Sequence, residues 1–132
     1  MDLIVSGYLL ELSIEDMRKR KLTLWILGIG FIGSVLYSFI YKGISGMVMG
    51  IIPGVILIIL SVLLPQSIGI GDGMLAVIYG VVYGWQRACF WLICGFLLVA
   101  VFGVFVSLFH REKCSMLPFV PFLTLVHVGM CL

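Results

Sequence analysis

Asp72 is the residue whose type and position most favour chemistry in this chain. It ends the tetrapeptide Gly69-Ile70-Gly71-Asp72 and is the only acidic residue between Asp16 and Glu112. A carboxylate at the centre of a membrane helix costs roughly 2.5–3.5 kcal/mol on insertion scales, so it needs a reason in so apolar a region. One reason is catalysis or ion binding at a glycine-rich turn. The other is an N-cap, because Asp is favoured just before an apolar helix. The tetrapeptide leaves both open.

The composition indicates whether water or lipid surrounds the chain. Of its 132 residues, 63% are hydrophobic and 11% are charged, and the mean hydropathy is +1.29. A soluble domain carries about 25% charged residues, so the composition predicts an integral membrane protein. The length allows a single domain, residues 1–132, of about five or six spans at ~20 residues each. Chemistry would then have to be built from helix ends and short loops.

The apolar runs predict an all-α membrane protein with about six segments, of which the first and last are short. Residues 3–14 are too few to cross the hydrocarbon core unaided at ~1.5 Å per residue. Further segments are expected at 22–41, 45–64, 73–83, 89–109 and 118–132. Pro65 is expected to end the third segment, and Trp85-Gln86-Arg87 is expected to form a polar break after the fourth. The GxGD tetrapeptide then lies at the start of the fourth segment.

Glycine, cysteine and histidine positions are interpreted as features of packing. Gly46, Gly50 and Gly54 repeat every fourth residue, a pattern that lets membrane helices approach closely. His127 is expected to have a packing or interfacial role rather than a catalytic one. The cysteines show no CxxC spacing and are interpreted as apolar fillers rather than metal ligands or a disulfide framework; they are Cys89, Cys94, Cys114 and Cys131.

The basic residues predict the orientation of the segments. If the loop at 18–21 is cytoplasmic, strict alternation places the loops at 65–72 and 110–116 on the same face. Lys42 and Arg87 are then the only basic residues on the opposite face. The cytoplasmic face holds the other six, which are Arg18, Lys19, Arg20, Lys21, Arg111 and Lys113. This positive-inside bias predicts that Asp16 and Asp72 lie at the cytoplasmic ends of two helices.

Two carboxylates on one membrane face can do acid–base chemistry together. When they lie within a few ångströms of each other, they cannot both ionise cheaply and tend to share one proton. The ionised member can then activate a water while the protonated member donates to a carbonyl, as in aspartic proteases. Gly69 and Gly71 would let an extended substrate approach Asp72. The alternative for Asp16 is a solvated charge paired with Arg20 at i,i+4.

Three stretches of the chain resemble the type IV prepilin (leader) peptidase family. The stretch Asp16-Met17-Arg18-Lys19-Arg20-Lys21-Leu22 resembles its first-aspartate motif, and Gly69 to Ala76, continued to Gly80 and Gly84, resembles its GxGD helix. Pro118-Phe119-Val120-Pro121-Phe122-Leu123 resembles its late PFGPFL motif. The chain departs from the family at Thr23-Leu24, where Pro-Asn is usual, and at Met74, where a Lys normally follows GxGD.

The resemblance implies a GxGD membrane aspartyl protease with a core of six membrane segments. Asp16 and Asp72 would be catalytic, and Gly69, Gly71, Pro118 and Pro121 would support the substrate site. From chemistry alone, two prolines before an apolar run are ordinary residues for the beginning of a helix. The resemblance therefore supplies the role of Pro118 and Pro121.

The resemblance also implies partners and location. The substrate would be a prepilin or pseudopilin, cut at the cytoplasmic face of the plasma (inner) membrane, with membrane lipids as the surroundings. No metal, no organic cofactor and no nucleic acid is expected. The larger bifunctional members carry paired CxxC zinc motifs, and this chain is expected to be the short form without them. The alternative is a non-catalytic membrane scaffold or a small ion or solute carrier, in which Asp72 caps a helix or binds a cation.

Overall fold

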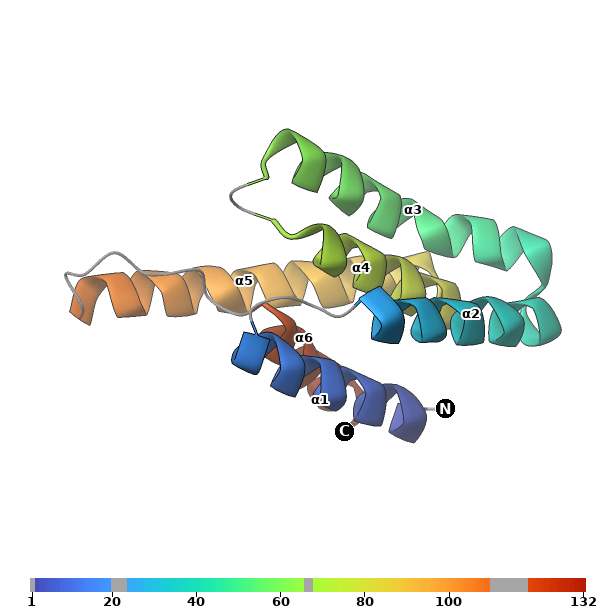
Figure 1. Ribbon diagram of the computed structural model, residues 1–132, viewed down its shortest axis with the longest axis horizontal. Coiled ribbons are helices and arrows are strands. Elements are labelled where there is room, and N and C mark those ends of the chain that lie inside the picture. The colour runs from blue at the N-terminus through green and yellow to red at the C-terminus, as the bar shows by residue number, and fades with distance from the viewer. Residues whose placement is uncertain (1, 20–23, 66–67, 110–118) are drawn as a thin grey trace. The chain divides into compact units, whose positions relative to one another are not determined.

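The computed structural model describes residues 2–19, 24–65, 68–109 and 119–132, and these ranges form helices without any strand (Figure 1). The all-α prediction is therefore confirmed. In chain order the helices are α1 (Asp2–Lys19), α2 (Leu24–Tyr41), α3 (Gly43–Leu63), α4 (Ile70–Tyr83), α5 (Trp85–Phe109) and α6 (Val120–Cys131).

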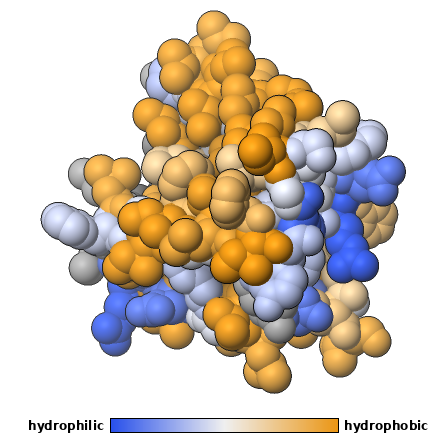
Figure 2. All heavy atoms as spheres, turned by 90° about the vertical axis from the view of Figure 1, so that its right-hand side faces the viewer, coloured by the Kyte–Doolittle hydropathy of each residue, from blue (hydrophilic) through white to orange (hydrophobic). Residues whose placement is uncertain are grey.

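Helices α2, α3 and α5 are long and apolar enough to cross a membrane, with mean hydropathies of 1.8, 2.6 and 2.8. Helices α4 and α6 are apolar but shorter, with 14 and 12 residues. Many large apolar side chains are exposed on the long helices, among them Trp25, Ile40 and Leu108, and Figure 2 shows apolar side chains over much of the visible surface. Soluble proteins rarely expose so much apolar surface to water. The protein is therefore a membrane protein.

The chain forms two compact units. One unit contains residues 1–20 and 91–132, and within it α1 packs against α6. The other contains residues 21–90, and within it α4 packs against α3 and α2. Helix α5 contributes its first residues to the second unit and the rest to the first. Each unit holds one of the two predicted catalytic aspartates.

Close packing of α3 on α4 depends on glycine. A Cβ atom on Gly50 would collide with the backbone carbonyl of Gly80, and one on Gly54 would collide with the backbone of Val77. The predicted small-residue face is thus confirmed at Gly50 and Gly54. Gly46 differs, because a Cβ there would touch only the side chain of Lys42, at 3.3 Å. The two helices run side by side and antiparallel in Figure 1, so this contact positions α4 along most of its length.

The helix boundaries differ from the predicted segments at two places near the site. Helix α1 continues past residue 14 to Lys19, so Asp16 lies in its last turns. Helix α4 begins at Ile70, so Asp72 lies inside the helix and not ahead of it. Both extensions add polar residues to the end of an apolar helix, where unsatisfied backbone groups favour polar surroundings. Hydrophobicity alone therefore underestimates the lengths of both helices.

The predicted polar break at Trp85-Gln86-Arg87 is wrong. These residues form the first turn of α5, and Gly84 is the single non-helical residue between α4 and α5. Gly84 has φ 95° and ψ 163°, a conformation that is essentially restricted to glycine. A change in backbone direction needs such a conformation, whereas polar side chains are tolerated in a first helical turn. Farther back, α3 ends at Leu63, two residues before Pro65, as predicted.

Candidate active site

Asp72 lies in the first turn of α4. The N-cap of this helix is Gly69, which has an extended backbone at φ −77° and ψ 141°. The backbone N–H of Asp72 donates to the carbonyl oxygen of Gly69 at 3.1 Å. Asp72 is thus the third helical residue and not the N-cap that the alternative interpretation proposed. A carboxylate in a first turn is stabilised by the positive end of the helix dipole, which favours the ionised form of Asp72.

Gly69 gives the Asp72 carboxylate its position. A Cβ atom on Gly69 would lie 3.3 Å from Oδ2 of Asp72, a tight approach, so the carboxylate rests beside bare backbone. Gly73 fixes the same turn from the other side, since a Cβ there would lie 3.0 Å from the backbone nitrogen of Ile58 in α3. Gly71 is the second residue of α4 and is half-buried. With Gly69 exposed, an extended backbone can approach the turn from outside.

Asp16 lies near the end of α1 and is half-buried. Its Oδ2 accepts a hydrogen bond from the backbone N–H of Val120, the first residue of α6, at 3.4 Å. Burial raises the pKa of Asp16 above its ordinary value, and the Val120 N–H acts in the opposite direction by favouring the charged form. Burial is the larger effect, so the carboxyl group holds its proton to higher pH than an exposed Asp does.

The start of α6 is held against α1 by side chains of its own first turns. Thr124 donates its hydroxyl to the carbonyl oxygen of Val120 at 2.9 Å and lies 3.3 Å from that of Leu9 in α1. Pro121 lies in the first turn, where its missing N–H costs no helical hydrogen bond. This arrangement holds the Val120 N–H against Asp16. The late Pro-Phe motif thus contacts the first-aspartate motif within one unit.

Helix α5 anchors α6 from another direction. The buried Trp91 donates its indole N–H to the carbonyl oxygen of Leu123 at 2.8 Å. The rings of Phe96 and Phe119 pack against each other at a tilt, with centroids 4.9 Å apart, and Gly95 leaves room for the side chain of Leu123. Sequence reasoning missed Trp91, Val120 and Thr124. The signal for Trp91 was present, because a Trp inside an apolar run needs an acceptor for its N–H.

The structure therefore brings the predicted site residues into two groups. Asp16 and Pro121 belong to one unit, and Gly69, Gly71 and Asp72 belong to the other. The pairing of the two carboxylates stays a prediction. Pro118 and Arg20, the alternative partner of Asp16, lie outside the described residues.

The remaining candidates are His127 and the cysteines. His127 is 1% exposed, and its Nε2 lies 3.6 Å from Sγ of Cys131, so its predicted packing role is confirmed. Cys89, Cys94 and Cys131 carry unbridged thiols, and Cys114 lies outside the described residues. Within the described ranges, no group of three or more His, Cys, Asp or Glu side chains has an arrangement that could hold a metal ion.

Comparison with protein families identifies the kind of site. The family model described as the type IV leader peptidase family matches residues 3–104, which is 102 of the 132 residues. The chain belongs to the type IV leader peptidase family. The matched range contains both Asp16 and Asp72 and ends before α6. Comparisons with curated proteins and with solved structures return no match.

Membership in the leader peptidase family shows what class of protein this is. The protein is a membrane protease, a hydrolase whose family acts on prepilin-like substrates in general. This result favours the peptidase over the scaffold or carrier alternative. It also agrees with the expectation from the three resembling stretches.

Proposed function

We propose that the chain is an aspartic endopeptidase of the inner membrane that removes the leader of type IV prepilin-like precursors. Asp16 and Asp72 are the catalytic pair, and cleavage takes place at the cytoplasmic face. The observation that carries this proposal is the placement of Asp16, half-buried on α1 with its carboxylate against the first N–H of α6. A surface charge at a helix end would need neither this burial nor this donor.

The surroundings of the two carboxylates suggest which one begins the reaction as the base. Asp72 lies at the positive end of α4, which favours its charged form, whereas burial of Asp16 favours its protonated form. Asp72 takes a proton from water, and the water oxygen attacks the scissile carbonyl carbon while Asp16 donates its proton to the carbonyl oxygen. Collapse of the tetrahedral intermediate breaks the C–N bond. The leaving amine takes the proton from Asp72, and the hydroxyl proton returns to Asp16.

The bare turn at Gly69 supports a substrate in extended conformation. Backbone carbonyls inside a helix already accept hydrogen bonds, so the substrate must unwind locally before its carbonyl can be attacked. A strand needs room for its backbone, and Gly69 supplies that room next to Oδ2 of Asp72. A precursor with a basic leader and a following apolar helix would present such a segment at the membrane boundary.

The test is the replacement of each carboxylate by an isosteric amide. Asp16→Asn and Asp72→Asn, separately, are expected to reduce cleavage of a co-expressed prepilin to background, because each removes a titrating group from the pair. Cleavage is measured by the shift of the precursor band and by sequencing the new N-terminus. Glu11→Gln, an exposed carboxyl on the same helix as Asp16, is the control and should cut normally. Full cleavage by either Asn variant would refute the assignment.

A further inference from the structure

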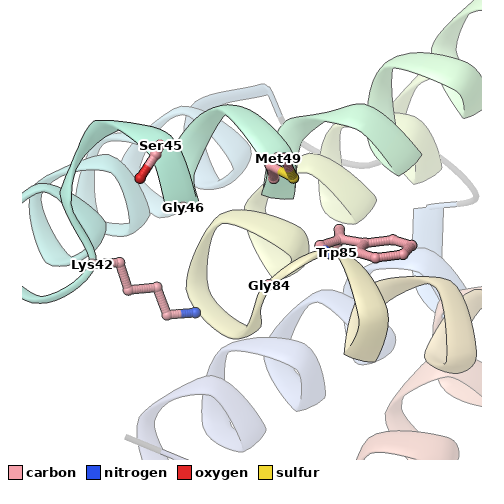
Figure 3. A pocket seen from close by; sticks show the side chains of 6 residues that line it. All are labelled: Lys42, Ser45, Gly46, Met49, Gly84 and Trp85. Atoms are coloured by element: carbon pink, nitrogen blue, oxygen red, sulfur yellow. The ribbon is translucent and has the colours of Figure 1, made fainter.

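A pocket opens in the unit of residues 21–90 at the end of α4 opposite Asp72. It has a volume of about 470 Å³, and its lining residues are Lys42, Ser45, Gly46, Met49, Gly84 and Trp85 (Figure 3). Gly84 is twelve positions after Asp72 in the sequence, which corresponds to roughly 18 Å along a helix. The pocket is therefore distinct from the candidate active site.

Lys42 lines this pocket, and a second cation, Arg87, lies near enough for its charge to act on Lys42. Lys42 stands between α2 and α3 and extends toward Gly84 in Figure 3; its Nζ lies 3.9 Å from the position that a Cβ on Gly84 would occupy. Arg87 lies in the first turn of α5. Burial lowers the pKa of Lys42, and the positive charge of Arg87 lowers it further. The two like charges thus repel each other beside the pocket.

The sequence places no acidic residue at this end of the unit. Residues 21–90 contain a single carboxylate, Asp72, and it lies at the other end of α4. The first turns of α3 and α5 contain no acidic residue, and Lys42, the N-cap of α3, makes no capping hydrogen bond with its side chain. Helix N-termini add partial positive charge. Within this unit, the fixed charge near the pocket therefore has one sign, which an anion would neutralise.

Gly84 lines the pocket and places no side chain in it. Its φ of 95° and ψ of 163° are accessible in practice to glycine alone, so no side chain fills the turn between α4 and α5. The first N–H groups of α3 and α5 have no acceptor within their own helices. Lys42 and Ser45 thus line a pocket beside the starts of α3 and α5, and Arg87 lies near Lys42. This is the donor set that phosphate oxygens require.

We infer that this pocket binds a phosphate group, with Lys42 and Arg87 as its counterions. The headgroup of an anionic phospholipid is the favoured source. Ile44 and Phe90, one beside each helix start, are 67% and 58% exposed and offer apolar surface to acyl chains. Trp85, half-exposed at the rim, is a residue type that favours the level of the headgroups. A free phosphate ion shares the chemistry and is the other source to be tested.

The experiment measures lipid binding to the full chain in detergent by native mass spectrometry. Phosphatidylglycerol is compared with diacylglycerol of the same acyl chains, which lacks the phosphate. Phosphatidylglycerol is expected to bind and diacylglycerol is not. The double variant Lys42→Gln/Arg87→Gln should weaken phosphatidylglycerol binding by at least about tenfold, because two charge-assisted contacts are lost. Lys42→Arg, which keeps the charge, should bind as the parent chain does, as should Arg18→Gln on α1.

Each outcome decides the inference. Inorganic phosphate that binds the parent chain, but not the double variant, supports the site and identifies the free ion as a source. Equal binding of diacylglycerol and phosphatidylglycerol overturns the inference, as does unchanged phosphatidylglycerol binding by the folded double variant. If that variant fails to fold by circular dichroism and gel filtration, the comparison of the two lipids on the parent chain, read from Trp fluorescence, decides instead.

Discussion

At the scale of single residues, the protonation of Asp16 depends on two opposing effects. Burial makes its charge costly, and the N–H of Val120 stabilises part of that charge. Exposed carboxylates at helix ends are normally solvated and contribute little to stability. Asp16 is instead held where its protonated form is favoured, a property that suits a proton donor and reduces the stability of the folded chain at neutral pH.

This arrangement predicts a pH-dependent effect of Asp16→Asn on stability. The pKa of Asp16 is raised in the folded chain, so its contribution to stability is present below the unfolded pKa of about 3.9 and is lost as pH rises through the folded pKa. The Asn variant should therefore have a higher Tm in detergent than the parent chain at pH 7. The difference should shrink toward pH 4. A parent chain that is the more stable one at pH 7 would contradict this account of Asp16.

At the scale of elements, α4 is positioned by contact with the backbone of α3. Gly50 meets Gly80, and Gly54 meets Val77, with no space for another carbon atom at either glycine. In a membrane such packing is a main source of helix association, because lipid offers no hydrophobic driving force between helices. The position of Asp72 relative to α3 therefore depends on glycines far from it in sequence.

A matched pair of glycine substitutions tests the α3–α4 contact. Gly50→Ala should lower stability by about 1–3 kcal/mol, because the new methyl group forces the helices apart. Gly33→Ala on α2 is the control, since a Cβ there meets nothing within 4 Å and alanine favours the helix. Thermal unfolding in detergent gives both values. Equal effects of the two substitutions would mean that the close approach does not stabilise the pair.

Helix α6 is a second positioning element, and its anchor is Trp91. Trp91→Phe removes the indole donor to the Leu123 carbonyl and should cost about 0.5–1.5 kcal/mol, because a buried hydrogen bond is lost. Cleavage of the prepilin should also slow, since α6 carries the N–H that contacts Asp16. Trp25→Phe on α2, where the side chain is 82% exposed, is the control. Unchanged stability and cleavage in Trp91→Phe would exclude this anchoring role.

At the scale of the whole molecule, the two proposed catalytic aspartates belong to different compact units. Asp16 lies near the end of α1 in one unit, and Asp72 lies near the start of α4 in the other. The distribution of basic residues predicts that both helix ends face the cytoplasm, with Lys42 and Arg87 on the other face. The proposed site for hydrolysis and the proposed phosphate site would then lie at opposite surfaces of the membrane.

Cysteine labelling tests this topology. In a chain whose four native cysteines are replaced by Ser, Arg18→Cys and Lys42→Cys are introduced separately. A membrane-impermeant maleimide added to intact spheroplasts should label the Lys42→Cys chain alone, and permeabilisation should expose the Arg18→Cys chain. Labelling of both chains from the same side would refute the predicted orientation and, with it, the shared face of Asp16 and Asp72.

The sequence by itself determined the membrane environment, the helical class and the family. These follow from hydrophobic runs and from residues adjacent in the chain. Asp72 could be singled out for the same reason, as an isolated carboxylate in an apolar region. Only the tertiary structure showed that Gly69 is the N-cap of α4, that Gly84 alone separates α4 from α5, and that Val120 donates to Asp16. These features depend on backbone conformation and on contacts 104 residues apart, and neither leaves a local pattern in the sequence.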